Sequence, residues 1–233
     1  MKYIIANHKM NHNELMVKNW IYDFDLGVKK INILSDDIKI IIAPSYIHIP
    51  FFTELSKKYP FIKICSQDFS QNLKGTYTGK VSVLQIKDFC EYSIIGHSET
   101  LDDIDLKIAK IKLALEHKIS PIICTKNPVL DYKFIDNLIN FNNNSSIIAF
   151  EDPVNISKDG VYNQKPIEQI RQAVQVIKQK YNKNNIVYGG SVNEKNILDI
   201  SDINELSGVL VGNASLNPQS FLEIIKVYNN LKW

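Results

Sequence analysis

The sequence lacks the many cysteines, the long apolar runs and the excess of positive charge on which disulfide-rich, membrane-spanning and nucleic-acid-binding proteins depend. Its three cysteines, Cys65, Cys90 and Cys124, lie far apart, which favours buried reduced thiols over disulfides or a metal site. The formal net charge is only +2, so neither a nucleic acid nor a membrane surface is expected as a partner. No apolar run reaches the roughly 18 residues of a transmembrane helix, and Lys9 and His12 interrupt the first apolar stretch, unlike in a signal peptide. We therefore expect a cytoplasmic protein.

What the sequence does contain is an alternation of short apolar runs with longer amphipathic ones. The short runs are continuous and rich in Ile and Val, which is typical of parallel strands that are covered on both faces. These predicted strands are Tyr3–Asn7, Ile38–Ala43, Phe61–Ser66, Tyr92–Gly96, Ile119–Cys124, Ser146–Glu151, Ile186–Gly189 and Gly208–Gly212.

The longer runs show helical periodicity. Within Asp102–Lys118, the residues Ile104, Ile108, Ile111 and Leu115 recur at helical spacing and predict one apolar stripe. The other predicted helices are Asn13–Leu26, Tyr46–Lys58, Ser82–Cys90, Leu130–Phe141, Lys165–Tyr181, Asn193–Ile200 and a last helix after Asn217. Pro218 suits the first turn of that last helix, and Asn217 is its expected N-cap.

Eight strands that are each followed by a helix predict a single-domain α/β fold. Residues 1–233 are long enough for one (β/α)8 barrel, the TIM barrel, and show no linker or low-complexity segment. The main competitor is a doubly wound open sheet. The absence of a glycine-rich dinucleotide-binding motif after the first strand weakens that competitor.

Polar residues gather at the ends of the predicted strands, where a (β/α)8 barrel forms its active site. Lys9 follows the first strand, His97 and Glu99 follow the fourth, and Glu151 ends the sixth. Two glycine-containing turns follow the seventh and eighth strands, and they comprise Gly189, Gly190, Ser191, Gly212 and Asn213. Each feature alone is more common in a structural role than in a functional one. Their coincidence at one face of the barrel favours a functional site.

These residue types fit one class of reaction. Glycine turns expose backbone N–H groups that bind phosphate, and a lysine stabilises negative charge on a substrate oxygen. A carboxylate such as that of Glu151 can remove a proton from a carbon next to a carbonyl, while the His97 imidazole hydrogen-bonds the carbonyl oxygen. The combination predicts an isomerase of a small phosphorylated sugar that needs no metal or other cofactor.

Six segments, in order along the chain, resemble motifs of the triosephosphate isomerase family. They are Ala6–Asn11, Gly75–Gly79, Ile95–Glu99, Ala149–Glu151, Tyr188–Val192 and Leu210–Leu216. The resemblance implies an enzyme of glycolysis and gluconeogenesis that interconverts dihydroxyacetone phosphate and D-glyceraldehyde 3-phosphate through an enediolate. It also implies a cytoplasmic homodimer without a cofactor.

The resemblance further implies roles for the matching residues. Lys9 is the electrostatic partner of the substrate, His97 the neutral electrophile and Glu151 the base, with Glu99 as a supporting residue. A position of His97 before the helix near Asp102 agrees with a neutral imidazole, because a helix N-terminus disfavours a cation. The implied substrate-binding residues are Asn7, Lys9, Ser157, Gly189, Gly190, Ser191, Gly212 and Asn213. The implied dimer loop contains Tyr77 and Thr78.

The segment after Glu151 departs most from the family pattern. The family has a hinged lid there, whereas this chain has Asp152–Gly160, with Asn155 where the family has a hinge Trp. Asp152 could face Glu151 and raise its pKa, or it could face solvent. A weaker lid predicts earlier release of the enediolate and more methylglyoxal as a side product.

Three further positions differ from the family. Lys80 and Thr100 replace an interface Glu and Arg, which together predicts a re-made subunit contact. His8 stands where Trp is common and is expected to pack rather than react. Two alternatives remain open. One is a weakened barrel homologue kept as a phosphate-binding or interaction protein, and the other is a different sugar-phosphate isomerase or lyase that uses a Schiff-base lysine.

Overall fold

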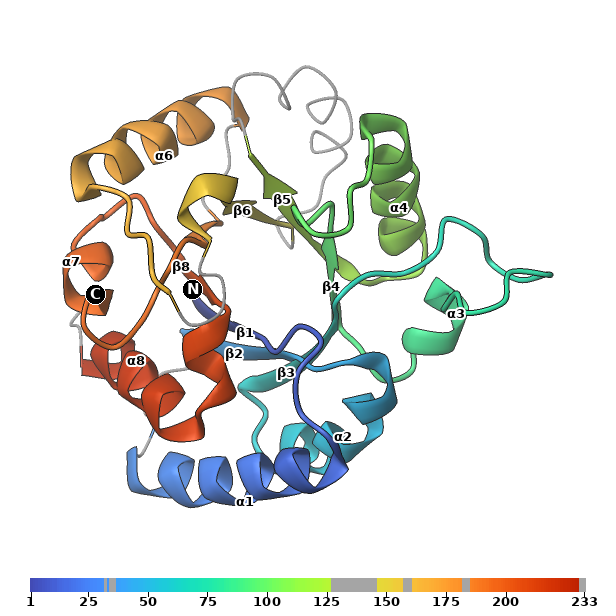
Figure 1. Ribbon diagram of the computed structural model, residues 1–233, viewed down its shortest axis with the longest axis horizontal. Coiled ribbons are helices and arrows are strands. Elements are labelled where there is room, and N and C mark those ends of the chain that lie inside the picture. Colours follow the sequence, from blue (N-terminus) through green and yellow to red (C-terminus); the bar gives the residue numbers. More distant parts are fainter. Residues whose placement is uncertain (32, 34–36, 127–145, 157–160, 182–184, 231–233) are drawn as a thin grey trace.

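The computed structural model describes residues 1–233 except residues 32, 34–36, 127–145, 157–160, 182–184 and 231–233. Its strands form one closed parallel barrel surrounded by helices, in the order β1 to β8 (Figure 1). The strands are β1 (Lys2–Asn7), β2 (Ile38–Ala43), β3 (Ile62–Ser66), β4 (Tyr92–Ile95), β5 (Ser120–Thr125), β6 (Ile147–Phe150), β7 (Ile186–Tyr188) and β8 (Gly208–Val211). The α-helices are α1 (Glu14–Ile31), α2 (Ile49–Lys58), α3 (Val83–Ile86), α4 (Ile104–Glu116), α6 (Ile167–Tyr181), α7 (Ile197–Ser201) and α8 (Pro218–Asn230).

Closure of the barrel decides between the two predicted α/β folds. Strand β1 pairs with β2 on one side and with β8 on the other, so that Ala6 lies opposite both Ile42 and Val211. A doubly wound sheet has two free edges, and this barrel has none. The predicted single-domain (β/α)8 barrel is therefore confirmed.

The strands are apolar throughout because both of their faces are buried. Successive residues of a strand point to opposite faces. In β1, Tyr3 and Ile5 belong to the cluster inside the barrel, whereas Ile4 and Ala6 pack in the cluster between the strands and the helices. All four side chains are at most 5% exposed. This is why no alternation of apolar and polar residues is visible in the sequence.

Several predicted boundaries shift, because the residues at the strand ends leave the ladder. Gly96 has a φ of +70°, which takes it out of the extended region, so β4 ends at Ile95. The predicted helix Ser82–Cys90 shortens to α3, which begins with a capping box between Ser82 and Gln85. The predicted helix Leu130–Phe141 lies outside the described residues. At α8 the prediction holds, because the Asn217 side chain accepts the N–H groups of Gln219 and Ser220.

The apolar stripe predicted for α4 is only partly right. Ile111 is buried, but Ile104 and Ile108 are half-buried, and two lysines, Lys107 and Lys110, lie on the buried face. The helix is therefore rotated relative to the predicted stripe. Lys110 is accommodated because its ammonium group pairs with the carboxylates of Asp68 and Asp102.

One segment projects beyond the ring of helices. It connects β3 with α3 and forms the extension beside α3 in Figure 1. The predicted dimer-loop residues Tyr77 and Thr78 lie on it, and the Tyr77 side chain is 48% exposed. Among the described residues, no helix combines the length and the apolarity needed to cross a lipid bilayer.

Candidate active site

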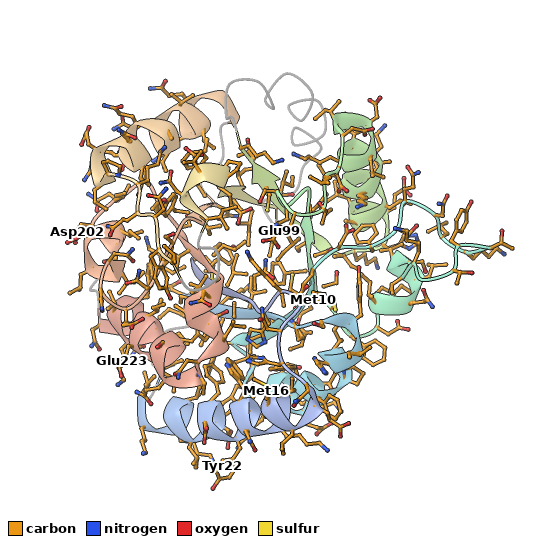
Figure 2. All side chains as sticks on the ribbon, in the orientation of Figure 1. Met10, Met16, Tyr22, Glu99, Asp202 and Glu223 are labelled. Atoms are coloured by element: carbon orange, nitrogen blue, oxygen red, sulfur yellow. The ribbon has the colours of Figure 1, made fainter. Side chains whose placement is uncertain are left out.

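A pocket opens at the C-terminal ends of the strands, at the face where the sequence places the polar residues. Its lining residues come from the ends of β1, β4, β6, β7 and β8, and they are Lys9, His97, Glu151, Ile156, Gly189, Gly190, Ser191, Val192, Leu210 and Gly212. Glu99 lies over the strands in Figure 2, whereas Tyr22 and Glu223 lie at the outside of the helix ring. The structure thus brings the three predicted catalytic side chains together in one pocket.

Lys9 enters this pocket because its backbone is held in an unusual conformation. Its φ is +52°, in the left-handed region that costs energy for a residue other than glycine. The Asn7 side chain accepts the Lys9 N–H at 3.1 Å, and the Lys9 carbonyl accepts from Ser45 Oγ and Gln67 Nε2, each at 3.0 Å. These three hydrogen bonds offset the strain. Asn7 thus acts on Lys9 and is not among the residues that line the pocket.

The ammonium group of Lys9 is held at the mouth of the pocket by Glu99. Lys9 Nζ lies 2.6 Å from Glu99 Oε1, and the two side chains are 21% and 55% exposed. An ion pair this exposed contributes little to stability. Its effect is to hold the cation of a residue that lines the pocket.

His97 and Glu151 face each other across the floor of the pocket. His97 Nε2 lies 3.3 Å from Glu151 Oε1, and the side chains are 5% and 3% exposed. The backbone N–H of Glu99 donates to His97 Nδ1 at 3.2 Å. An Nδ1 atom that accepts a hydrogen bond carries no proton, so the neutral ring holds its proton on Nε2, toward Glu151.

Two opposing effects act on the pKa of His97. Burial lowers the pKa, whereas the adjacent Glu151 carboxylate raises it and prevails in the ligand-free site. A raised pKa disagrees with the neutral imidazole that the sequence predicted from the helix near Asp102. The reason is the close carboxylate, which outweighs a helix that begins seven residues later, at Ile104. A ligand between the two side chains would separate the imidazole from that carboxylate.

Glu151 occupies a space that only glycine leaves open. A Cβ atom on Gly189 would lie 2.9 Å from Glu151 Cγ and 3.0 Å from Oε1. The buried Cys124 thiol lies against the same carboxylate, and burial followed by that negative charge raises the pKa of the thiol. Within the described part of the chain, Glu151 Oε2 has no hydrogen-bond partner. This oxygen is buried, and it is the other oxygen, Oε1, that faces His97.

The turn after β7 lines the pocket and contains backbone N–H groups that no described residue accepts. Ser191 has a φ of +49°, and its carbonyl is held by the side-chain amides of Asn193 and Asn196 at 3.0 and 2.9 Å. None of the hydrogen bonds between described residues uses the backbone N–H of Gly190 or Ser191. Such free N–H groups in a tight turn suit an anion.

Ser191 also fastens the segment that follows Glu151. Its Oγ donates to the Asn155 carbonyl at 2.7 Å and accepts the N–H of Asn163 at 3.0 Å. Asn155 Nδ2 donates to the Asn163 carbonyl at 3.0 Å. Asn155, at the position of the family's hinge Trp, is thus buried and hydrogen-bonded. Ser157 lies outside the described residues.

Asp152 points away from the base. It accepts the N–H of Val154 at 3.1 Å and pairs with Lys165 Nζ at 2.7 Å. The hydrogen bond from Lys165 lowers the pKa of Asp152. The possibility that Asp152 faces Glu151 is therefore wrong. The side chain instead links the Val154 backbone to the Lys165 ammonium group.

Other predicted residues are not among those that line the pocket. Asn213 Nδ2 donates to the Tyr162 hydroxyl at 3.0 Å, and Asn213 is not among the lining residues. Tyr77 and Thr78 lie on the projecting segment. Conversely, sequence reasoning missed Gln67, which directly follows β3 and could have been found by the same search of strand ends. It also missed Cys124, for which an apolar strand gives no signal.

Comparisons with known proteins agree on one family. A sequence profile of "Triosephosphate isomerase" matches residues 2–228. The chain is 33% identical to a triosephosphate isomerase from Wolbachia pipientis wMel over 96% of this chain and 92% of the relative. It is 32% identical to one from Mesomycoplasma hyopneumoniae (strain 232), over 96% and 98% of the two chains. With one from Ehrlichia chaffeensis it shares 31% identity over 95% of each chain.

Proposed function

The chain belongs to the triosephosphate isomerase family and interconverts dihydroxyacetone phosphate and D-glyceraldehyde 3-phosphate, and we propose that Lys9, His97 and Glu151 carry out this reaction. The observation that carries the proposal is the approach of His97 Nε2 to Glu151 Oε1 at 3.3 Å, in the pocket that Lys9 also lines. A base beside a hydrogen-bond donor suits removal of a proton next to a carbonyl, with the substrate entering between the two side chains. The relatives are all named as isomerases and give no support to a barrel kept only for binding.

In the first step, Glu151 removes a proton from the carbon beside the carbonyl of the substrate. Its carboxylate is buried, so little water competes for the proton. The Nε2–H of His97 hydrogen-bonds the carbonyl oxygen, on which negative charge develops, and the Lys9 ammonium group stabilises the same charge. The intermediate is an enediolate.

The second step reverses the first on the neighbouring carbon. His97 passes a proton between the two enediolate oxygens, and Glu151 returns its proton to the other carbon. No atom is lost or gained, which defines an isomerisation. The phosphate group is proposed to bind the N–H groups of Gly190 and Ser191, in the turn that begins at Gly189, and the turn at Gly212, with Ser157 and Asn213 as further contacts.

A coupled isomerase assay with glyceraldehyde 3-phosphate tests this assignment. We expect Glu151→Gln, which keeps the shape of the side chain, to lower kcat on the order of 10²- to 10⁴-fold. Glu168→Gln, on the exposed side of α6, serves as the matched control and should leave kcat unchanged. A Glu151→Gln variant that keeps kcat within tenfold of the wild type would remove Glu151 from the mechanism.

We also propose that the protein works as a homodimer through the face that carries the projecting segment. Large apolar side chains are exposed there or near Lys9, among them Met10 at 95%, Ile47 at 77% and Leu101 at 82%. Tyr77 and Thr100 line one groove on this face, and exposed apolar side chains of this size suit an association site. Sedimentation equilibrium should give twice the mass of the chain for the wild type and a lower mass for Leu101→Lys. A monomeric wild type at micromolar concentration would refute the dimer.

A cytoplasmic location is proposed on the chemistry of the cysteines. Cys65, Cys90 and Cys124 are all buried as free thiols, which agrees with a reducing compartment. Fractionation of the source cells would find the protein with cytoplasmic markers.

A further inference from the structure

Helix α4 buries a lysine directly behind the active site. Lys107 is 6% exposed and lies on the face of α4 that packs against the barrel. A lysine is rarely buried to this extent unless its ammonium group is paired or hydrogen-bonded. Lys110, one turn later, meets this condition through ion pairs with Asp68 at 2.7 Å and with Asp102 at 2.8 Å, which is a structural role.

The aliphatic part of Lys107 supports the turn that presents His97. Gly96 has a φ of +70°, and a Cβ atom there would lie 2.2 Å from Lys107 Cε and 2.9 Å from Cδ. The lysine chain therefore fills the space beside the Gly96 backbone. Because Gly96 directly precedes His97, this contact lies one residue from the imidazole.

The ammonium group of Lys107 reaches the neighbouring strand. Its Nζ donates to the Cys124 carbonyl, near the end of β5, at 3.0 Å. The Cys124 thiol lies against the Glu151 carboxylate, and the carbonyl of the next residue, Thr125, accepts the Glu151 N–H at 3.0 Å. A charged donor in a buried setting makes a strong hydrogen bond. The same side chain thus touches the turn before His97 and the strand end behind Glu151.

We propose that Lys107 is a positioning residue for the isomerisation, which fixes the ends of β4 and β5 so that His97 and Glu151 keep their mutual placement. This inference rests on the proposed roles of His97 and Glu151. Lys107 is not among the residues that line the pocket, and its contacts with the strand ends that carry the reacting groups are made at Gly96 and Cys124. The turns that are proposed to bind the phosphate follow β7 and β8, whereas Lys107 contacts the ends of β4 and β5.

The proposal predicts a split between the kinetic constants. Lys107→Met keeps the length and the hydrocarbon of the side chain but removes the ammonium group. We expect kcat to fall on the order of tenfold or more, because small displacements of reacting groups are costly, while KM stays within twofold of the wild type. Lys112→Met, on the exposed side of the same helix, is the matched control and should leave both constants unchanged.

The outcomes separate this inference from the proposed function. An inactive wild type would remove the proposed function itself. An active wild type whose Lys107→Met variant keeps kcat within twofold, or loses kcat no more than Lys112→Met, would overturn the role of Lys107. An equal change in KM and kcat would also overturn it, because that result indicates a general disturbance. If Lys107→Met yields no folded protein by circular dichroism, Lys107→Gln is assayed under the same criteria.

Discussion

His8 should make the stability of the protein fall steeply in mild acid. The ring is 1% exposed and packs against Trp20 and Phe52, with ring centroids 4.9 and 5.8 Å away. Within the described part of the chain, neither of its ring nitrogens has a hydrogen-bond partner. Burial, with further contributions from His12 and His48, lowers the pKa of His8 to about 3.

The sign and size of the effect follow from proton linkage. The pKa of a histidine in the unfolded chain is about 6.5, so between pH 6.5 and about 3 the unfolded state binds one proton more than the folded state. The stabilising effect of a neutral His8 is complete above pH 6.5 and is lost as the pH falls. Each pH unit below 6.5 costs about 1.4 kcal/mol, so about 2 kcal/mol is lost at pH 5. At pH 5 the folded-state pKa hardly matters, because the folded form is still neutral.

Urea unfolding at a fixed protein concentration, at pH 8 and pH 5, measures this effect. His8→Phe keeps a buried ring but cannot titrate, so the wild type should lose about 2 kcal/mol more than the variant between the two pH values. His117→Gln, which changes the histidine at the C-cap of α4, controls for removal of any histidine. If the wild type and His8→Phe show the same pH dependence, His8 is not a buried neutral group and the packing described here is wrong.

Two further changes test the packing around the site. Gly189→Ala should displace Glu151, because the new Cβ would lie 2.9 Å from Glu151 Cγ; we expect kcat to fall on the order of 10²-fold with a loss of only about 1–3 kcal/mol in urea unfolding, and a kcat within threefold would refute this. Lys110→Met should leave the Asp102 carboxylate, 3% exposed, without its cation; we expect the free energy of unfolding to fall by about 3–5 kcal/mol, and a loss below about 1 kcal/mol would show that the pair is unimportant.

The barrel could be predicted from sequence because its signal is local and repeated. Every strand is buried on both faces, as Ile4 and Ile5 show by packing on opposite sides of β1, and this requirement leaves continuous apolar runs. The strand ends then carry the chemistry in any (β/α)8 barrel. For this reason the sequence alone predicts that Lys9, His97 and Glu151 lie at one mouth of the barrel.

What could not be predicted depends on contacts between distant segments. The direction of Asp152 is set by Lys165, thirteen residues later, and the sequence contains no rule that pairs them. The two lysines on the buried face of α4 contradict the periodicity of the helix itself. Lys110 is buried because Asp68, on another loop, supplies a carboxylate, and Lys107 because the β5 backbone supplies a carbonyl. The burial of both lysines thus depends on tertiary partners, which the pattern of one helix does not show.

A crystal structure with bound phosphoglycolate, a mimic of the enediolate, tests the central assignment most directly. We predict that its carboxylate lies between His97 Nε2 and Lys9 Nζ, with Glu151 in contact, and that its phosphate meets the backbone of the Gly189–Ser191 turn. A ligand bound elsewhere, with His97 and Glu151 still facing each other and neither touching it, would contradict the proposed active site.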